Sequence, residues 1–141
     1  MNNPIYPCLW FDNQAQEAAA FYCSVFKNSK ITIDTPMVVN FELNGKKFMG
    51  LNGGPQFKFN ESVSFVVECD DQNEIDYYWN KLTAGGAESQ CGWLKDKYGV
   101  SWQIVPKRLG ELMKGDAKKS QRVMQVLMTM GKIEIAKLEE A

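Results

Sequence analysis

Residues 91–106, CGWLKDKYGVSWQIVP, contain two short runs of strand-forming residues around a tight turn. Trp93–Asp96 and Val100–Val105 are rich in aromatic and β-branched side chains, which favour strands. Tyr98-Gly99 is a turn signal, and Pro106 ends the second run because proline cannot continue the ladder. This pattern predicts two adjacent strands at the end of a larger module.

The residues before this pair predict the rest of that module. Ser62–Cys69 is a continuous apolar run, which we interpret as a strand buried on both faces. Asp70 or Asp71 then caps a helix that Gly85-Gly86 ends. The apolar stripe of this helix is Ile75, Tyr78, Trp79 and Leu82, and Ala87–Cys91 is a further strand.

The first half of the chain has the same order of elements. Asp12 or Asn13 is the expected cap of its helix, Asn44-Gly45 is a type I′ hairpin signal, and Asn52-Gly53-Gly54-Pro55 marks a boundary. The predicted elements are a strand at 5–11, a helix at 15–26, and strands at 30–34, 37–43 and 46–51. The order strand–helix–strand–strand–strand therefore occurs twice, with a period near 55–60 residues.

The tail, residues 107–141, predicts helices. Its segments are a helical turn at Leu109–Met113, a helix at 117–130 with Val123, Met124, Leu127 and Met128 on one face, and a piece at 133–138. We interpret this Met-rich tail as cover for the sheet or for a dimer partner; a cap over a ligand is the alternative.

Composition narrows the class of protein. The 141 residues are 45% hydrophobic and 23% charged with a net charge of -1, which indicates a folded chain without the basic surface of a nucleic-acid binder. No apolar run approaches the roughly 20 residues of a membrane helix, and the N-terminus does not resemble a signal peptide. We therefore expect a cytoplasmic protein with no nucleic-acid or membrane partner.

Four cysteines and no histidine limit the chemistry. No two cysteines have CxxC spacing, which predicts reduced and mostly buried thiols. Cys8, Cys69 and Cys91 are possible nucleophiles, but no histidine is available to activate them, and a structural role is favoured. Zinc catalysis normally uses histidine or a thiolate cluster, and the sequence offers neither.

The segments 52–55 and 91–106, together with DDQNEIDYYWNKL at 70–82, resemble the PhnB-like family of the glyoxalase, bleomycin-resistance and dioxygenase (vicinal oxygen chelate) superfamily. The resemblance implies an α+β fold in which paired βαβββ modules form a U-shaped mixed sheet, followed here by C-terminal helices. It implies one domain at 1–106 built from modules 1–54 and 55–106, an extension at 107–141, and a cleft often completed by homodimerisation. Family members are often labelled demethylubiquinone methyltransferases.

Metal-using relatives carry His or Glu on the first and last strands of each module. The resemblance places these positions near Ile5, near Leu51–Asn52, near Ser62–Val63 and on Gln103, and none of them carries His, Asp or Glu. Gln56 stands where PhnB-like relatives often have histidine. A neutral amide without charged companions holds a divalent ion poorly, so we predict no metal and no cofactor.

The candidate ligand-binding residues are those expected on the concave face of the sheet: Trp10, Gln56, Phe65, Trp93, Trp102 and Gln103. Packing in the core is the alternative for the aromatic residues, and it is the favoured role of Trp102 and Trp79. Asp96 has the position of a turn residue, and Glu42 and Glu68 form an acid–base pair only if both face the cleft.

Three functions follow from these residues. The first is a metal-independent homodimer that binds a small molecule, and it is the one we favour. The second is an enzyme of the superfamily, a lyase, isomerase or the labelled methyltransferase, although the sequence has no glycine-rich loop between a strand and a helix for a Rossmann-type cofactor. The third is a non-catalytic dimerisation module, which the Met-rich tail supports.

Overall fold

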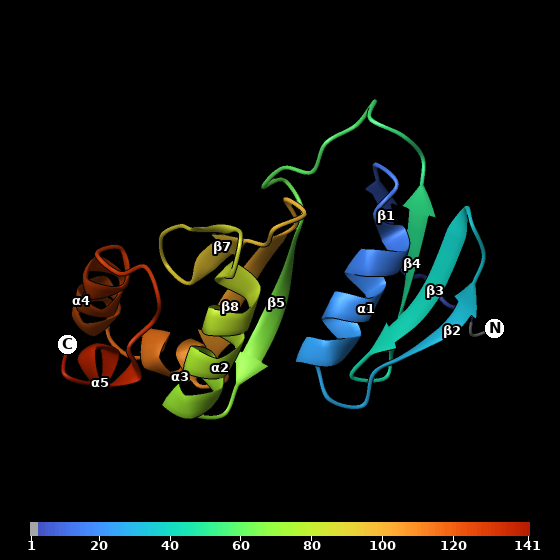
Figure 1. The fold of residues 1–141 in the computed structure, drawn as a ribbon. Coiled ribbons are helices and arrows are strands. Elements are labelled where there is room, and N and C mark those ends of the chain that lie inside the picture. The colour runs from blue at the N-terminus through green and yellow to red at the C-terminus, as the bar shows by residue number, and fades with distance from the viewer. Residues whose placement is uncertain (1–2) are drawn as a thin grey trace. The chain divides into compact units, whose positions relative to one another are not determined.

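A computed structural model describes residues 3–141, which divide into two compact units. Unit 1 ends at Phe59, and unit 2 runs from Asn60 to Ala141 (Figure 1). Each unit contains one four-stranded mixed sheet and a helix that joins its first two strands.

The elements of unit 1 are β1 (Cys8–Phe11), α1 (Ala15–Val25), β2 (Lys30–Asp34), β3 (Val38–Leu43) and β4 (Lys46–Asn52). Its strands lie in the order β1-β4-β3-β2, with β1 parallel to β4 and the other pairs antiparallel. The helix α1 covers one face, where the rings of Tyr22 and Phe41 stack with centroids 6.2 Å apart. Both side chains are fully buried, so this contact lies in the core of unit 1.

Turns and caps show where local sequence decides the structure and where it does not. Asn44 and Gly45 have φ values of 50° and 79°, as the predicted type I′ turn requires. The predicted cap of α1 by Asp12 or Asn13 is wrong. Asn52 at the end of β4 performs that role, because its Oδ1 accepts a hydrogen bond of 2.8 Å from the backbone N–H of Ala15.

The elements of unit 2 are β5 (Ser64–Cys69), α2 (Gln72–Thr83), β6 (Ala87–Glu88), β7 (Trp93–Lys95) and β8 (Ser101–Pro106), followed by three C-terminal helices. The strand order β5-β8-β7-β6 repeats that of unit 1, and the helices begin at residues 15 and 72. The predicted α+β fold of two βαβββ modules followed by helices is therefore confirmed.

The strand β5 differs from its prediction. Val66 is 56% exposed and Glu68 is also exposed, so the strand is not buried on both faces. The physical reason is its place at the edge of a sheet that α2 covers on one side only. The apolar run reflected strand propensity rather than two-sided burial.

The C-terminal helices are α3 (Leu109–Met113), α4 (Ala117–Leu127) and α5 (Ile135–Glu139). They form a core cluster with the end of β8; its buried members are Val105, Leu112, Val123, Leu127, Met130, Ile133 and Leu138. The prediction that Met124 and Met128 share the buried face is wrong, because they are 41% and 64% exposed. No helix within residues 3–141 has the length and apolar character to cross a membrane.

Candidate ligand-binding site

The sheet of unit 2 has one face covered by α2 and an opposite face, which we call the open face. The indole N–H of Trp79 on α2 donates to Glu88, 2.7 Å away, and Glu88 pairs with Leu94 in the register. Leu94 therefore points towards α2. Its register partner on β8, Trp102, points the same way, and so does Ile104 two residues further on. Alternation places on the open face Ser64, Val66, Trp93, Lys95, Ser101 and Gln103.

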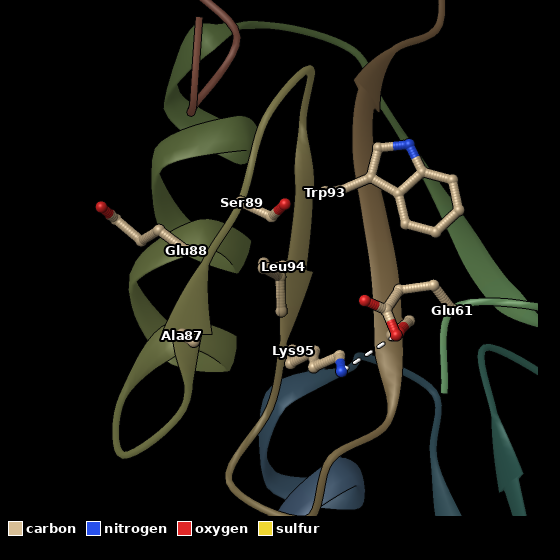
Figure 2. A pocket seen from close by; sticks show the side chains of 8 residues that line it. Glu61, Ala87, Glu88, Ser89, Trp93, Leu94 and Lys95 are labelled. Carbon is tan, nitrogen blue, oxygen red and sulfur yellow. Dashed lines mark ion pairs between the residues drawn. The ribbon is translucent and has the colours of Figure 1, made fainter. Parts of the chain in front are cut away.

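A pocket of about 240 Å³ lies on the strands β6 to β8. The open-face residues Trp93, Lys95 and Ser101 line it together with Glu61 from the segment before β5. Figure 2 shows the side chains of Trp93, Lys95 and Glu61 on one side of the strands, with Glu88 pointing away from them. Ala87, Glu88, Ser89 and Leu94 complete the lining.

Ser101 gives this pocket an unusual polar group. The residue is only 1% exposed, and its Oγ has no hydrogen-bond partner among residues 3–141. Buried polar atoms in native proteins are nearly always hydrogen-bonded, because an unmade bond costs free energy. The hydroxyl can donate one hydrogen bond and accept others, so it can bond to a molecule in the pocket once a neighbouring side chain moves aside.

An ion pair borders the same pocket. Lys95 Nζ lies 3.0 Å from Glu61 Oε1, and the side chains are 39% and 64% exposed (Figure 2). The hydrogen bond from Lys95 holds the pKa of Glu61 below its ordinary value, so this carboxylate is ionised at neutral pH. Lys95 is the only cationic side chain among the residues that line the pocket.

Gln103 also lies on the open face, beside Trp93 in the register. Its Nε2 donates to the hydroxyl of Ser64 on the neighbouring parallel strand, 2.9 Å away. The pair therefore links β5 to β8 through side chains as well as through the backbone. Of the predicted site residues, Trp93 and Gln103 are the two that this face brings together.

Phe65 and Trp102 lie on the other face of the same sheet. They are register partners with ring centroids 5.5 Å apart, and Trp102 is 3% exposed. The indole N–H of Trp102 donates to Asp96 Oδ2, while Asp96 Oδ1 accepts from the backbone N–H groups of Tyr98 and Val100. Asp96 thus has the predicted turn role, and Trp102 packs in the core of unit 2.

The predicted residues Trp10 and Gln56 belong to unit 1. The indole of Trp10 packs against the backbone of Gly53, where even a Cβ atom would lie 2.4 Å from the ring, and its N–H donates to the Gly54 carbonyl 2.9 Å away. The ring of Phe57 meets Trp10 edge-on at 5.0 Å. Gln56 is exposed. The absence of a side chain at Gly53 therefore leaves room for the Trp10 indole.

Unit 1 also holds a buried polar atom without a partner. Asn40 on β3 is 8% exposed, and its Oδ1 accepts no hydrogen bond from residues 3–141. Val39 and Phe41 on either side of Asn40 are fully buried on the α1 side, so alternation directs Asn40 to the opposite face. In each unit, the buried polar atom without a hydrogen-bond partner, Asn40 Oδ1 or Ser101 Oγ, thus lies on the sheet face opposite the helix α1 or α2.

The cysteines offer little nucleophilic chemistry. All four thiols are free, but Cys69 alone is fully buried, so the prediction of mostly buried thiols is wrong. Burial, with a smaller contribution from neighbouring carboxylates, raises the pKa of Cys69 from 9.0 to about 12. Burial also raises the pKa of the exposed Cys8. Both thiols therefore remain protonated at neutral pH.

The side chains present do not fit the divalent metal that the fold's metal-using relatives hold. Residues 3–141 contain no group of three or more His, Cys, Asp or Glu side chains that could bind an ion. Ile5 is fully exposed, and the Asn52 amide is engaged with Ala15, Gln16 and Pro36. Gln103 and Ser64 leave only neutral oxygens, which are weak ligands without a carboxylate.

Of the eight residues that line the pocket, the sequence predicts Trp93 alone, and the polar residues that the site depends on, Glu61, Lys95 and Ser101, are not among the predicted ones. Period-2 alternation was a usable signal for two of them, since Lys95 is two residues after Trp93 and Ser101 two residues before Gln103. Residue type alone favours Phe65 and Trp102, which the strand register places on the other face. Glu61 lies in an irregular segment, where no periodicity indicates direction.

The paired βαβββ modules define the fold class, which is the glyoxalase and bleomycin-resistance type of fold. A fosfomycin resistance protein from Listeria monocytogenes, solved with Mn(II) and a sulfate ion, has a TM-score of 0.59 and 12% identity, with 86% of this chain and 97% of that chain covered. A glyoxalase-related enzyme from Fulvimarina pelagi has a TM-score of 0.55 and 14% identity, with 75% and 88% covered. At these identities, the similarity shows the fold alone.

A more specific match gives the family. The model of the 3-demethylubiquinone-9 3-methyltransferase family matches residues 3–105. A PhnB protein from Bacillus cereus, provisionally named a 3-demethylubiquinone-9 3-methyltransferase, is 33% identical with a TM-score of 0.68, and 74% of this chain and 99% of that chain are covered. The chain belongs to this PhnB-like family, as predicted. No curated protein sequence matches it.

Proposed function

We propose that the protein binds a small molecule on the open face of unit 2 without the help of a metal ion. The observation that carries this proposal is the Ser101 hydroxyl, buried at the pocket with no partner among the described residues. A polar atom in this state lowers the stability of the free protein. A ligand that hydrogen-bonds to it recovers that loss on binding.

The residues around Ser101 supply what a small-molecule site needs. Trp93 contributes an aromatic surface to the pocket, and Lys95 and Ser101 contribute polar groups to the same lining. Sites of this kind combine apolar walls with a few polar groups that orient the ligand. Gln103 lies next to Trp93 in the register and adds an amide at the margin.

The family's description suggests methyl transfer as an alternative. Nucleotide-containing cofactors on Rossmann-like sheets need a glycine-rich turn between a strand and a helix. The loops from β1 to α1 and from β5 to α2 read Asp12-Asn13-Gln14 and Asp70-Asp71, without glycine. Binding without catalysis is therefore the function that the residues of this chain support better.

The proposal also includes a homodimer in the cytoplasm, with residues 1–106 as one domain and 107–141 as an extension. The division is supported by the family match, which ends at residue 105 and leaves α3, α4 and α5 outside it. Light scattering coupled to size-exclusion chromatography measures the oligomeric state.

The test is a titration of chelator-treated protein with a panel of small metabolites, in which tryptophan fluorescence reports binding. We expect at least one compound to bind without added metal. The variant Ser101→Ala should weaken it by about tenfold, and Trp93→Phe should remove most of the fluorescence change. Ser24→Ala on α1 is the matched control. Binding that needs a metal, or that neither pocket variant alters, would contradict the proposal.

A further inference from the structure

We propose that the ligand of this pocket is a small aromatic monoanion of the arylcarboxylate type, and that Glu61 is an internal competitor for its binding site on Lys95. This inference rests on the proposed function and specifies the chemistry of that site. It follows from the charge, the polar groups and the size of the pocket.

The ion pair between Glu61 and Lys95 shows where a ligand carboxylate would bind. Glu61 Oε1 lies 3.0 Å from Lys95 Nζ, which is the position that a ligand carboxylate would occupy. Glu61 comes from a turn before β5 and its side chain is 64% exposed, so it can rotate into solvent. Exposed ion pairs contribute little to stability, so the exchange of one carboxylate for another costs little.

The Ser101 hydroxyl makes the exchange of Glu61 for a ligand carboxylate favourable. Ser101 Oγ has no partner among residues 3–141 and lines the same pocket as Lys95, its direct register partner. A carboxylate accepts hydrogen bonds from an ammonium and a hydroxyl at the same time. Glu61 is bonded to Lys95, while Ser101 remains unsatisfied, so an incoming carboxylate that reaches both gains a bond that Glu61 does not make.

The volume and the charges of the pocket limit the size and charge of the ligand. The pocket of about 240 Å³ is smaller than the roughly 300–1,000 Å³ typical of drug-sized ligands, which suits one aromatic ring against Trp93. The lining holds one cation, Lys95, and one carboxylate on the same side of the strands, Glu61, because the Glu88 side chain points away and bonds to Trp79 (Figure 2). A multiply charged phosphate would find one cation for several negative charges here, whereas a single negative charge matches the single lysine.

The test compares benzoate with benzamide, which has nearly the same shape and no charge. The protein is labelled with ¹⁵N-tryptophan, and Trp93→Phe assigns the Trp93 indole signal among the four tryptophans. We expect benzoate to shift this signal more strongly than benzamide, with an affinity that falls as salt is added. Glu61→Gln should tighten benzoate binding about threefold, and Lys95→Met should weaken it about tenfold.

Lys81→Met, on the exposed side of α2, removes the same charge elsewhere and should change neither affinity. Equal binding of benzamide and benzoate, or an unchanged benzoate affinity in Glu61→Gln and Lys95→Met, overturns the anion assignment and leaves the proposed function standing. Absence of any Trp93 shift with either probe also overturns the aromatic-anion assignment. The proposed function fails only if the metabolite panel gives no metal-free binding either.

Discussion

Gln103 on β8 donates a hydrogen bond to Ser64 on β5, with Nε2 and Oγ 2.9 Å apart, across two strands that run parallel. The nearby Ser101, which pairs with Ser64 in the register, has no such partner among residues 3–141. Two serines on the same face of one sheet therefore differ in one respect. One hydroxyl completes a structural contact, and the other makes no hydrogen bond with the described residues.

This difference predicts opposite effects on stability. Ser101→Ala should raise the free energy of unfolding of the ligand-free protein by about 1 kcal/mol, since it removes a buried, unsatisfied hydroxyl. Ser64→Ala should lower it by about the same amount, since Gln103 loses its acceptor. Urea unfolding of both variants measures the two signs. A loss of stability in Ser101→Ala would mean that the hydroxyl already has a structural partner.

Asp96 should be among the most important polar residues of unit 2. It is 3% exposed and accepts hydrogen bonds from the Tyr98 and Val100 backbone and from the Trp102 indole. Asp96→Ala leaves these donors buried without an acceptor and should cost about 2 to 4 kcal/mol. Asp116→Ala, which removes the cap of α4, is the control and should cost about 1 kcal/mol. Equal losses in chemical denaturation would contradict the assigned role of Asp96.

The buried thiol of Cys69 predicts a loss of stability at alkaline pH. Its pKa is about 12 in the folded chain against an ordinary 9.0, so the folded state keeps the proton where the unfolded state releases it. The contribution to stability is complete below pH 9 and is lost as the pH rises from 9 towards 12. The stability difference between the wild type and Cys69→Ala should therefore fall above pH 9, by at most about 1.4 kcal/mol per pH unit. A difference that stays constant across this range would contradict the burial of the thiol.

The C-terminal helices should behave as part of the core of unit 2. Ile133 is fully buried, its carbonyl accepts a hydrogen bond from Gln72 Nε2 on α2, and the N–H of Ile135 donates to Gln72 Oε1. Ile133→Ala should lower the free energy of unfolding by about 2 to 4 kcal/mol, since it opens a cavity. Met128→Ala, at a 64% exposed position, should change it by less than about 0.5 kcal/mol. Equal effects would indicate that these helices are appended to the unit without packing on it.

Much of the fold was predictable because its elements are local. The strand at Lys30–Asp34 and the helical turn at Leu109–Met113 have the predicted bounds, and Asp71 caps α2 through a bond from the Glu74 N–H. Residues with β-branched side chains, an acidic cap or an Asn-Gly turn carry their information within a few positions.

The predictions that proved wrong depend on contacts between residues far apart in the sequence. The N-terminus of α1 is capped by Asn52, 37 positions further along the chain than Ala15, which no local motif indicates. Val66 is exposed because β5 lies at a sheet edge, and the order of strands is a property of the topology. For the site, aromatic type predicted Trp93 and also Trp102, but only the strand register separates the open face from the core.

A crystal structure of the chelator-treated protein with its best-binding compound would show whether a small molecule binds on the open face of unit 2 without a metal. We expect density for an organic molecule beside Trp93, with an oxygen or nitrogen about 2.6 to 3.2 Å from Ser101 Oγ and no metal ion between them. A cation coordinated by Gln103 or Ser64, or a pocket closed by the protein's own side chains with the compound bound elsewhere, would contradict it.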